Sequence, residues 1–357
     1  MRIYPRGAEW RKWDLHVHAP GTKQNDGYGT PAPWDEYCRI IEESDVTVIA
    51  ITDYFSLDSY FQFVKEHHQR YPESEKVFLP NLELRLNETV NANQDEVHMH
   101  LLFRPDLTQE TAKRLLDRLQ VQHRERTGRW RTCSELETEQ DYASATVSRQ
   151  DIKEAITWVF GDREPAEESV LILVPANNDG IRARDSQRKK QLADEIERDC
   201  RALFGGQANR DYFLRIDRYE TDTPAPAKPV FAGSDAHTLK DLAEWLGKTV
   251  STPSQHKETT WIKADPTFDG LTQTLVEPAE RVRIQARKPD SKEPYKIIDR
   301  IHFDGTNEFP TEIVLNQNLV SIYWKPLIWQ VRTTRLHRPR DQPTGHTRGA
   351  GSGAAKY

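Results

Sequence analysis

The segment Val46-Thr-Val-Ile-Ala-Ile-Thr-Asp53 decides the fold class of this chain. Its almost uninterrupted run of β-branched and apolar residues is typical of a strand that is covered on both faces. The amphipathic stretch 57–71 comes next and predicts a helix. Because strand–helix repeats build parallel sheets, the sequence favours an α/β fold with a closed or doubly covered parallel sheet.

The same alternation continues on both sides of this segment. Strands are expected at 13–18, 46–51, 77–86, 97–103, 170–175 and 229–232. Helices are expected at 34–43, 57–71, 109–125, 149–159, 185–203, 239–246 and 268–276. The polar, turn-rich stretches 127–147 and 205–224 indicate loops or insertions.

Length and composition exclude several classes of protein. The chain has 357 residues, of which 36% are hydrophobic and 30% are charged. That length corresponds to two average domains, or to one α/β barrel of roughly 250 residues with an extension. No apolar run approaches the roughly 20 residues that cross a bilayer, and the first residues lack the apolar core of a signal peptide. We therefore expect a cytoplasmic protein with no membrane contact.

Cysteine and charge content narrow the choice further. Cys38, Cys133 and Cys200 are far apart and form no CxxC pair, which argues against a disulfide framework or a thiolate zinc site. With 50 basic and 56 acidic residues, the net charge of -6 provides no overall basic surface for nucleic acid. The stretch 325–357 is the exception, since it carries seven Lys or Arg and a single Asp.

The composition also predicts the domain boundaries. We expect residues 1–285 to form the barrel and residues 286–322 to begin a second element, with strand-like sequence at 295–303 and 312–322. Residues 323–357 lack apolar periodicity and are expected to be a disordered basic tail.

Histidines and carboxylates gather at the ends of the expected strands. His16 and His18 are two residues apart, so on a strand both imidazoles point to one side. His98 and His100 have the same spacing but lie inside a strand. The other members of the set are two single acids and one further pair, namely Asp53, Glu83, and Asp235 with His237.

This placement predicts a shared metal site. Parallel α/β barrels build their active sites at the carboxyl ends of strands, so residues from His16 to His237 can meet at one mouth. Imidazole and carboxylate ligands without thiolate suit Zn²⁺, Mn²⁺ or Fe²⁺ in a hydrolytic site. Each group also has a simpler interpretation, such as Asp53 as a helix cap or Glu83 as an ion-pair partner of Arg85. Three pairs and two single acids on successive strands are hard to explain in that way.

The motifs, taken in order, resemble those of a known family. The order is Asp14-Leu-His-Val-His18, Ala50-Ile-Thr-Asp-Tyr54, Asn81-Leu-Glu-Leu-Arg85, Val97-His-Met-His-Leu-Leu-Phe103 and Gly233-Ser-Asp-Ala-His237. Over residues 10 to about 245 it resembles the polymerase and histidinol phosphatase (PHP) family of metal-dependent phosphoesterases. The resemblance implies a distorted (β/α)7 TIM-like barrel that holds two or three divalent metal ions (Mn, Zn or Fe) and hydrolyses phosphate esters.

The resemblance also implies roles for single residues. By position, His16 and His18 match the family's first motif, Asp53 matches the second and Glu83 the third. The family's middle histidine matches His100 better than His98. Asp235 and His237 match the last motif. Asp53 and His237 would ligate metal and move protons. Arg85, Asn177 and Arg182 are our candidates for contact with a substrate phosphate.

Two departures from the family pattern leave a lower metal count open. Tyr54 follows Asp53 where the family usually has histidine. The stretch Val174-Pro-Ala-Asn-Asn-Asp-Gly180 has no histidine at the end of the fifth strand, so Asn177 or Asp179 would have to substitute for it.

A second resemblance concerns the chain after the barrel. The opening segment 8–22 and Leu315-Asn-Gln-Asn-Leu-Val-Ser-Ile322 resemble TrlF-type fusions of a PHP domain with an ATPase. No Walker A loop follows, so 286–322 is interpreted as the start of a truncated ATPase domain. The implied partners are a phosphoester, with DNA or RNA among the candidates, and an ATPase that is separate or missing. The alternatives are a catalytically degenerate PHP domain serving as scaffold or regulatory module of an ATPase, and an amidohydrolase-type metal enzyme.

Overall fold

The computed structural model describes most of the first 289 residues and two short strands beyond them. The described ranges are 8–90, 95–124, 129–161, 169–177, 180–181, 187–219, 223–248, 259–289, 300–302 and 312–314. The chain divides into two compact units, Met1–Asn318 and Leu319–Tyr357, and every described residue belongs to the first. The predicted tail 323–357 and most of 286–322 therefore lie outside the described residues, and the domain boundaries stay predictions.

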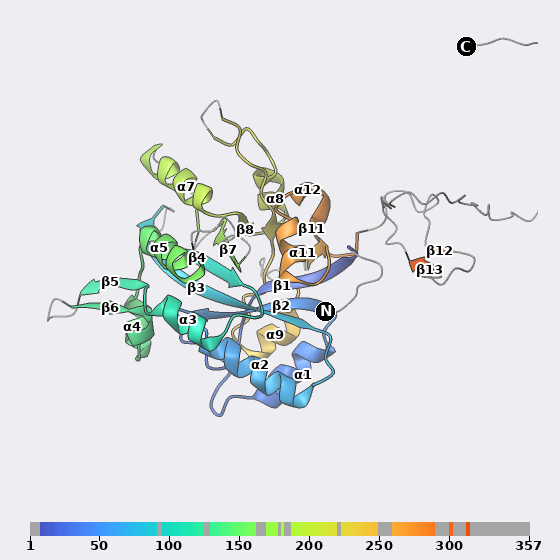
Figure 1. Ribbon diagram of the computed structural model, residues 1–357, viewed down its shortest axis with the longest axis horizontal. Helices are drawn as coiled ribbons and strands as arrows, with labels where there is room; N and C mark the ends of the chain where they lie inside the picture. Colours follow the sequence, from blue (N-terminus) through green and yellow to red (C-terminus); the bar gives the residue numbers. More distant parts are fainter. Residues whose placement is uncertain are drawn as a thin grey trace, which may run out of the picture. The chain divides into compact units, whose positions relative to one another are not determined.

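A nine-stranded sheet forms the centre of the fold (Figure 1). Its strand order is β11-β10-β1-β2-β3-β4-β7-β8-β9. The strands are β1 (Trp10–His18), β2 (Val46–Tyr54), β3 (Val77–Thr89), β4 (Glu96–Phe103), β7 (Val170–Pro175), β8 (Ala202–Phe204), β9 (Val230–Phe231), β10 (Thr259–Lys263) and β11 (Val282–Gln285).

The sheet curls until the chain beyond β9 reaches β10 and β1. The Thr260 hydroxyl, on β10, accepts from the Ala232 N–H at 2.6 Å and donates to the Ala232 carbonyl at 3.0 Å. Further along, the Asp235 N–H donates to the His16 carbonyl at 2.8 Å, and the His18 N–H donates to the Ala236 carbonyl at 3.1 Å. The sheet is therefore a nearly closed barrel, which confirms the predicted α/β barrel class.

The strand directions differ from the all-parallel sheet that the sequence favoured. β1, β2 and β3 run parallel, as do β7, β8 and β9, but β4 is antiparallel to both β3 and β7. β10 is antiparallel to β1 and to β11. The short connection from Thr89 to Glu96 explains the direction of β4, because a parallel crossover needs a dozen or more residues.

Helices pack around this sheet. In Figure 1, α1 (Trp34–Glu43), α2 (Asp58–Arg70) and α9 (Leu239–Trp245) group together, and α8 (Gln207–Phe213), α11 (Phe268–Gln273) and α12 (Pro278–Arg281) form another group. The other helices are α3 (Gln109–Leu116), α4 (Glu139–Ser144), α5 (Arg149–Phe160) and α7 (Gln187–Asp199). Side chains of Thr108, Ser148, Thr238 and Thr267 accept a backbone N–H at the first turns of α3, α5, α9 and α11, which fixes where these helices begin.

Two predicted helices end early. The helix expected at 109–125 stops at Leu116, and β5 (Gln120–Arg124) pairs instead with β6 (Trp130–Thr132). The helix expected at 185–203 stops at Asp199, and β8 follows it. The predicted loop 205–224 contains α8, and β10 and β11 were not predicted. Beyond the barrel, β12 (Arg300–His302) and β13 (Glu312–Val314) pair antiparallel, within the two stretches predicted to be strand-like.

A β-bulge in β1 determines which side chains face the barrel interior. The pairing of β1 with β2 shifts register between Asp14 and Val17. Leu15 therefore packs with the interior residues of the barrel, whereas Val17 packs against the α1 and α2 side. Bulges commonly re-aim side chains beside active sites, and this one directs the histidines of β1 inward.

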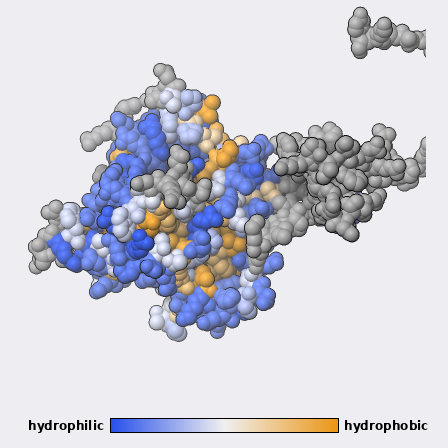
Figure 2. Space-filling model, viewed as in Figure 1, coloured by the Kyte–Doolittle hydropathy of each residue, from blue (hydrophilic) through white to orange (hydrophobic). Residues whose placement is uncertain are grey.

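The surface of the described part is mainly polar. In Figure 2, hydrophilic residues cover most of the face viewed, and hydrophobic residues reach the surface mainly near its middle. Among the described residues, no helix is long and apolar enough to cross a membrane.

Candidate metal centre

Three strands and the loop after β9 bring most of the predicted ligands to one end of the barrel. His16 and His18 come from the end of β1 and Glu83 from β3, both of which run toward this mouth. β4 runs in the opposite direction, so its first residues reach the same mouth. His100 stands opposite Glu83 and His98 opposite Arg85 in the register of β3 with β4. The antiparallel direction of β4 therefore explains why these two histidines lie within a strand rather than at its end.

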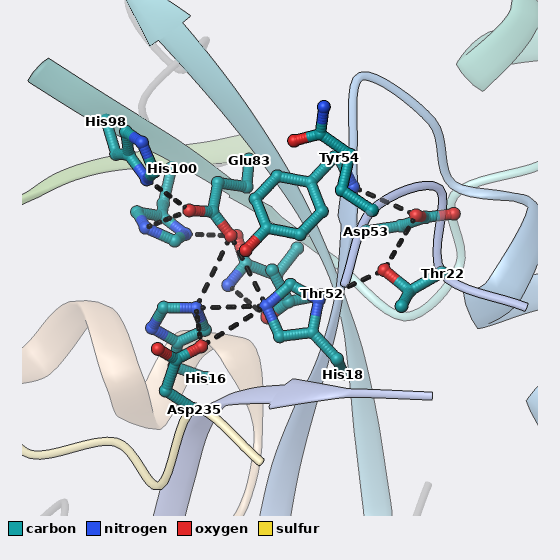
Figure 3. A network of polar contacts seen from close by, with 12 residues as sticks. His16, His18, Thr22, Thr52, Asp53, Tyr54, Glu83, His98, His100 and Asp235 are labelled. Carbon is teal, nitrogen blue, oxygen red and sulfur yellow. Dashed lines mark hydrogen bonds and ion pairs between the residues drawn. The ribbon is translucent and has the colours of Figure 1, made fainter. Parts of the chain in front are cut away.

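Two histidines and two carboxylates form the first half of the cluster (Figure 3). The Nε2 atoms of His16 and His18 lie 3.3 Å apart. Both are 3.4 Å from Oε2 of Glu83, and they are 3.1 and 3.4 Å from Oδ1 of Asp235. Four potential ligand atoms from three separate chain segments thus face one small volume.

The other carboxylate oxygen of Glu83 faces the second histidine pair. Oε1 lies 2.6 Å from Nδ1 of His98 and 3.8 Å from Nε2 of His100. Glu83, whose side chain is 2% exposed, therefore stands between His16 and His18 on one side and His98 and His100 on the other (Figure 3).

The hydrogen bonds around His100 show which of its ring nitrogens carries the proton. Asn81 donates through Nδ2 to the Leu15 carbonyl and the Thr52 hydroxyl, so its Oδ1 is an acceptor. That oxygen lies 3.3 Å from Nδ1 of His100, which must carry the proton. Nε2 of His100 then presents a lone pair to the Glu83 carboxylate. In the described part of the chain, neither this nitrogen nor Oε2 of Glu83 has a hydrogen-bond partner, although both are buried.

Two buried acceptor atoms of neighbouring side chains, each without a hydrogen-bond partner among the described residues, fit a site for a positive ion. Among the residues that the structure describes, two groups have ligand atoms close enough together to hold a metal: His16 with Glu83 and His100, and His16 with His18 and Asp235. The residues present therefore fit divalent metal ions bound through imidazole and carboxylate groups.

Electrostatics keep most of these groups in the form that binds metal. Burial alone would raise the pKa of Glu83, but hydrogen bonds from His16, His18 and His98 hold it well below its usual range. Burial holds the pKa of His100 well below its usual range, so this ring is neutral. For Asp235, burial is outweighed by His16 and His18, which lower its pKa to about 2. His18 differs, since Asp235 and Glu83 overcome burial and raise its pKa to about 9 in the metal-free protein.

Backbone geometry holds Asp235 against β1. Asp235 itself adopts a left-handed conformation with φ of 51°, which is strained for a residue with a side chain. Gly233 makes this close approach feasible, because a Cβ atom there would lie 2.5 Å from the Cβ of His16. The buried Asp14 carboxylate accepts from the N–H groups of Ser234 and Gly247. Asp14 thus anchors this loop.

Asp53 does not lie in the cluster that the sequence predicted for it. Alternation along β2 turns Thr52 and Tyr54 inward and Asp53 outward. Its carboxylate accepts hydrogen bonds from the N–H groups of Lys23, Tyr54 and Ser59, and from the Thr22 hydroxyl. Figure 3 shows Asp53 beside Thr22 and away from Glu83. Asp53 therefore organises the loop after β1 and the start of α2 rather than serving as a ligand.

Thr22 links Asp53 to the cluster and was missed in the sequence. Its hydroxyl donates to Asp53, so it must accept from Nδ1 of His18, which is 3.1 Å away. This contact leaves Nε2 of His18 as the atom directed into the cluster, an arrangement common for metal-binding histidines.

His237 lies at the edge of the cluster. Nδ1 of His237 is 2.9 Å from the Asp235 carbonyl, and Nε2 is 3.2 Å from the Tyr54 hydroxyl. The ring stacks on His18 at a centroid distance of 3.9 Å. Among the described residues, His237 belongs to neither group that could hold a metal.

The three residues predicted to contact a substrate phosphate have different surroundings. Arg85 donates to the Ala143 carbonyl and to Gln24, and its guanidinium lies 5.6 Å over the Phe55 ring. The Asn177 amide forms reciprocal hydrogen bonds with Asn209 on α8, both 3.1 Å long. Arg182 lies outside the described residues.

No family model and no curated protein sequence matches this chain. Solved structures to which it is similar include the lesion-specific endonuclease PfuEndoQ from Pyrococcus furiosus, which is 13% identical with a TM-score of 0.43. That match covers 77% of this chain and 57% of the endonuclease, so the chain spans little more than half of that protein.

Two further structures are similar in the same way. One is a putative metal-dependent phosphoesterase from Bifidobacterium adolescentis, with 13% identity, a TM-score of 0.31, and coverage of 64% of this chain and 88% of that one. The other is an amidohydrolase from Chromobacterium violaceum with bound SO4 and no metal, with 14% identity, a TM-score of 0.37, and coverage of 77% and 98%.

Proposed function

We propose that this protein is a metal-dependent hydrolase that cleaves phosphate esters, with nucleic-acid phosphodiesters as the substrate class we favour. The observation that carries the proposal is the buried Glu83 carboxylate between two histidine pairs, facing an unprotonated His100 nitrogen with no donor between them. The order of motifs, which resembles the PHP family, supports phosphorus rather than carbon as the reacting centre.

The ligands we assign to divalent metal are His16, His18, Glu83, His98, His100 and Asp235. A metal ion bound there would lower the pKa of a bound water to about 7 and polarise a phosphoryl oxygen. The chain's own residues supply the geometry: Thr22 orients His18, Asn81 orients His100, and the Asp14 carboxylate fixes the loop that carries Asp235. Preorganised ligands of this kind reduce the reorganisation that the reaction requires.

Arg85 is our candidate for binding the substrate phosphate. It lies two residues beyond Glu83 and pairs in register with His98, so it is next to the cluster. Its described hydrogen bonds go to a carbonyl and an amide, neither of which neutralises the guanidinium charge. A planar cation without a carboxylate partner suits bidentate contact with a phosphate.

The test is hydrolysis of bis-p-nitrophenyl phosphate and of a labelled single-stranded oligonucleotide by purified protein with added Mn²⁺. We expect turnover that EDTA abolishes and that His16→Ala removes. Replacing Arg85 by Met, which keeps the apolar stem over Phe55, should raise KM more than it lowers kcat. Metal-loaded, folded protein that cleaves neither phosphoester would contradict the proposal.

That last outcome would favour a second candidate, a metal-binding scaffold or regulatory module of an ATPase. Two contacts point in this direction. The Tyr54 hydroxyl is hydrogen-bonded to His237, and the Asn209 amide is hydrogen-bonded to Asn177. His237 and Asn177, which the sequence assigned to the site, are therefore both hydrogen-bonded to neutral side chains.

A further inference from the structure

Both ring nitrogens of His237 are already engaged. Nδ1 lies 2.9 Å from the carbonyl oxygen of Asp235, which can only accept, so Nδ1 carries the proton. The lone pair is therefore on Nε2. The Tyr54 hydroxyl, 3.2 Å away, is the donor to that lone pair.

This arrangement differs from that of the other histidines at the mouth. Nε2 of His16 and Nε2 of His18 lie within 3.4 Å of carboxylate oxygens, and Nε2 of His100 is buried with no hydrogen-bond partner among the described residues. A metal–nitrogen bond needs the lone pair at about 2.0–2.1 Å along its own direction. For His237 that direction is taken by the Tyr54 hydroxyl.

Ring stacking and a backbone contact hold the two rings. Tyr54 is 5% exposed, and its ring stacks on His18 at a centroid distance of 4.8 Å. Figure 3 shows the two rings near each other. His18 also stacks on His237, at a centroid distance of 3.9 Å. The Gly27 N–H donates to the His237 carbonyl at 3.0 Å, and a Cβ atom on Gly27 would lie only 2.9 Å from that oxygen. The backbone of His237 is thus held by a close contact.

We propose that Tyr54 keeps His237 out of the metal ligands and thereby limits the number of ions that this site holds. The inference rests on the metal centre of the proposed function. It assigns His237 a positioning role, in which the ring packs against the ligand His18 without binding metal itself. It also assigns the Tyr54 hydroxyl a role beyond the packing of the ring.

Metal equivalents per chain, measured by elemental analysis after dialysis against Zn²⁺ or Mn²⁺, test this proposal. His237→Ala should bind the same number of ions as the wild type, whereas His18→Ala, the matched removal of the neighbouring ring, should bind fewer. Tyr54→His should bind one more ion than the wild type, because it offers a second imidazole beside His237. The double variant Tyr54→His/His237→Ala should lose that gain.

The proton position on His237 gives a readout that does not depend on metal. In metal-free, ¹⁵N-labelled protein, His237 should show a proton on Nδ1, and Tyr54→Phe should shift the Nε2 resonance. A proton on Nε2 instead would overturn the inference.

The possible failures are distinguishable. Loss of an ion in His237→Ala, to the extent seen in His18→Ala, would overturn the role of Tyr54 but leave the metal centre intact. Absence of bound ions in every folded variant, the wild type included, would overturn both this inference and the proposed function. Near-ultraviolet circular dichroism confirms that each variant is folded, and His237→Gln serves as a second, more conservative removal.

Discussion

The backbone N–H of Asp235 donates to the carbonyl of His16 at 2.8 Å, which joins the last motif of the sequence to the first. The same contact closes the barrel and sets a carboxylate beside an imidazole, 3.1 Å apart. The contact that closes the barrel therefore also assembles the candidate site. A change that loosens this contact should affect stability and metal binding together.

Gly233→Ala tests that coupling. The added methyl would start 2.5 Å from the Cβ of His16, so the loop after β9 must move away from β1. We expect a loss of about 1–3 kcal/mol in the free energy of unfolding, the usual cost of overpacking a dense site. Urea unfolding measures that loss, and a metal titration should show weaker binding in the same variant. Unchanged stability and affinity would show that the two features are separate.

Replacing two carboxylates separates a ligand from a supporting residue. Asp53→Ala leaves the N–H groups of Lys23 and Ser59 without their acceptor, at a cost of about 1–3 kcal/mol for each one left unsatisfied. It should lower the melting temperature and keep the metal equivalents. Asp235→Ala should lose metal instead. If elemental analysis finds fewer ions in folded Asp53→Ala, Asp53 also supports metal binding, and its assignment as a purely structural residue is wrong.

Metal binding should release protons near neutral pH. In the metal-free protein, the carboxylates of Asp235 and Glu83 outweigh burial and raise the pKa of His18 to about 9, so His18 is charged at pH 7.5. A metal ion must displace that proton, and its apparent affinity should rise with pH up to about 9.

Calorimetric titration at pH 7.5 in buffers of different ionisation enthalpy counts the protons. We expect at least one to be released per chain, and the number should fall in His18→Gln. The raised pKa also stabilises the metal-free fold fully below pH 6.5, and that stability is lost as pH rises through about 9. A flat melting temperature across that interval in metal-free protein would argue against the charged state of His18.

A buried ion pair away from the mouth should carry much of the stability of the loop before β9. The Arg218 and Glu197 side chains, 1% and 5% exposed, lie 2.6 Å apart. Arg218→Met leaves the buried carboxylate with Lys228, 3.6 Å away, as its remaining cation, and removes the donor to the Phe213 and Pro226 carbonyls. It should cost about 1–3 kcal/mol in the free energy of unfolding. Arg215→Met is the matched control, because Arg215 pairs with Asp217 on the exposed surface and its loss should be small. Equal effects in the two variants would refute this distinction.

The sequence predicted which side chains lie close together where one strand decides the geometry. His16 with His18 and His98 with His100 face one side because side chains alternate along a strand, and this pattern is local. Glu83 was predicted from its place near the end of an apolar run. The helices 34–43 and 149–159 were predicted to within a residue at each end, because their apolar spacing is regular.

What the sequence missed depends on contacts between distant segments. Asp53 was placed in the site because it ends a strand, but alternation along β2 turns it outward. Which face of β2 lines the barrel depends on its pairing with β1 and β3. The roles of Thr22 and Tyr54 follow from contacts with His18 and His237, which no local pattern shows. The strand β10 is short, and it takes its place in the sheet by pairing with β11 and with β1, which lies at the start of the chain.

The central claim is that His16 and His18 hold divalent metal, and metal content tests it most directly. Protein purified without chelator, and then dialysed against Mn²⁺ or Zn²⁺, should contain bound metal by elemental analysis. The His16→Ala/His18→Ala variant, folded by circular dichroism, should contain far less under the same conditions. Equal metal content in the two proteins, or none in either, would contradict the account.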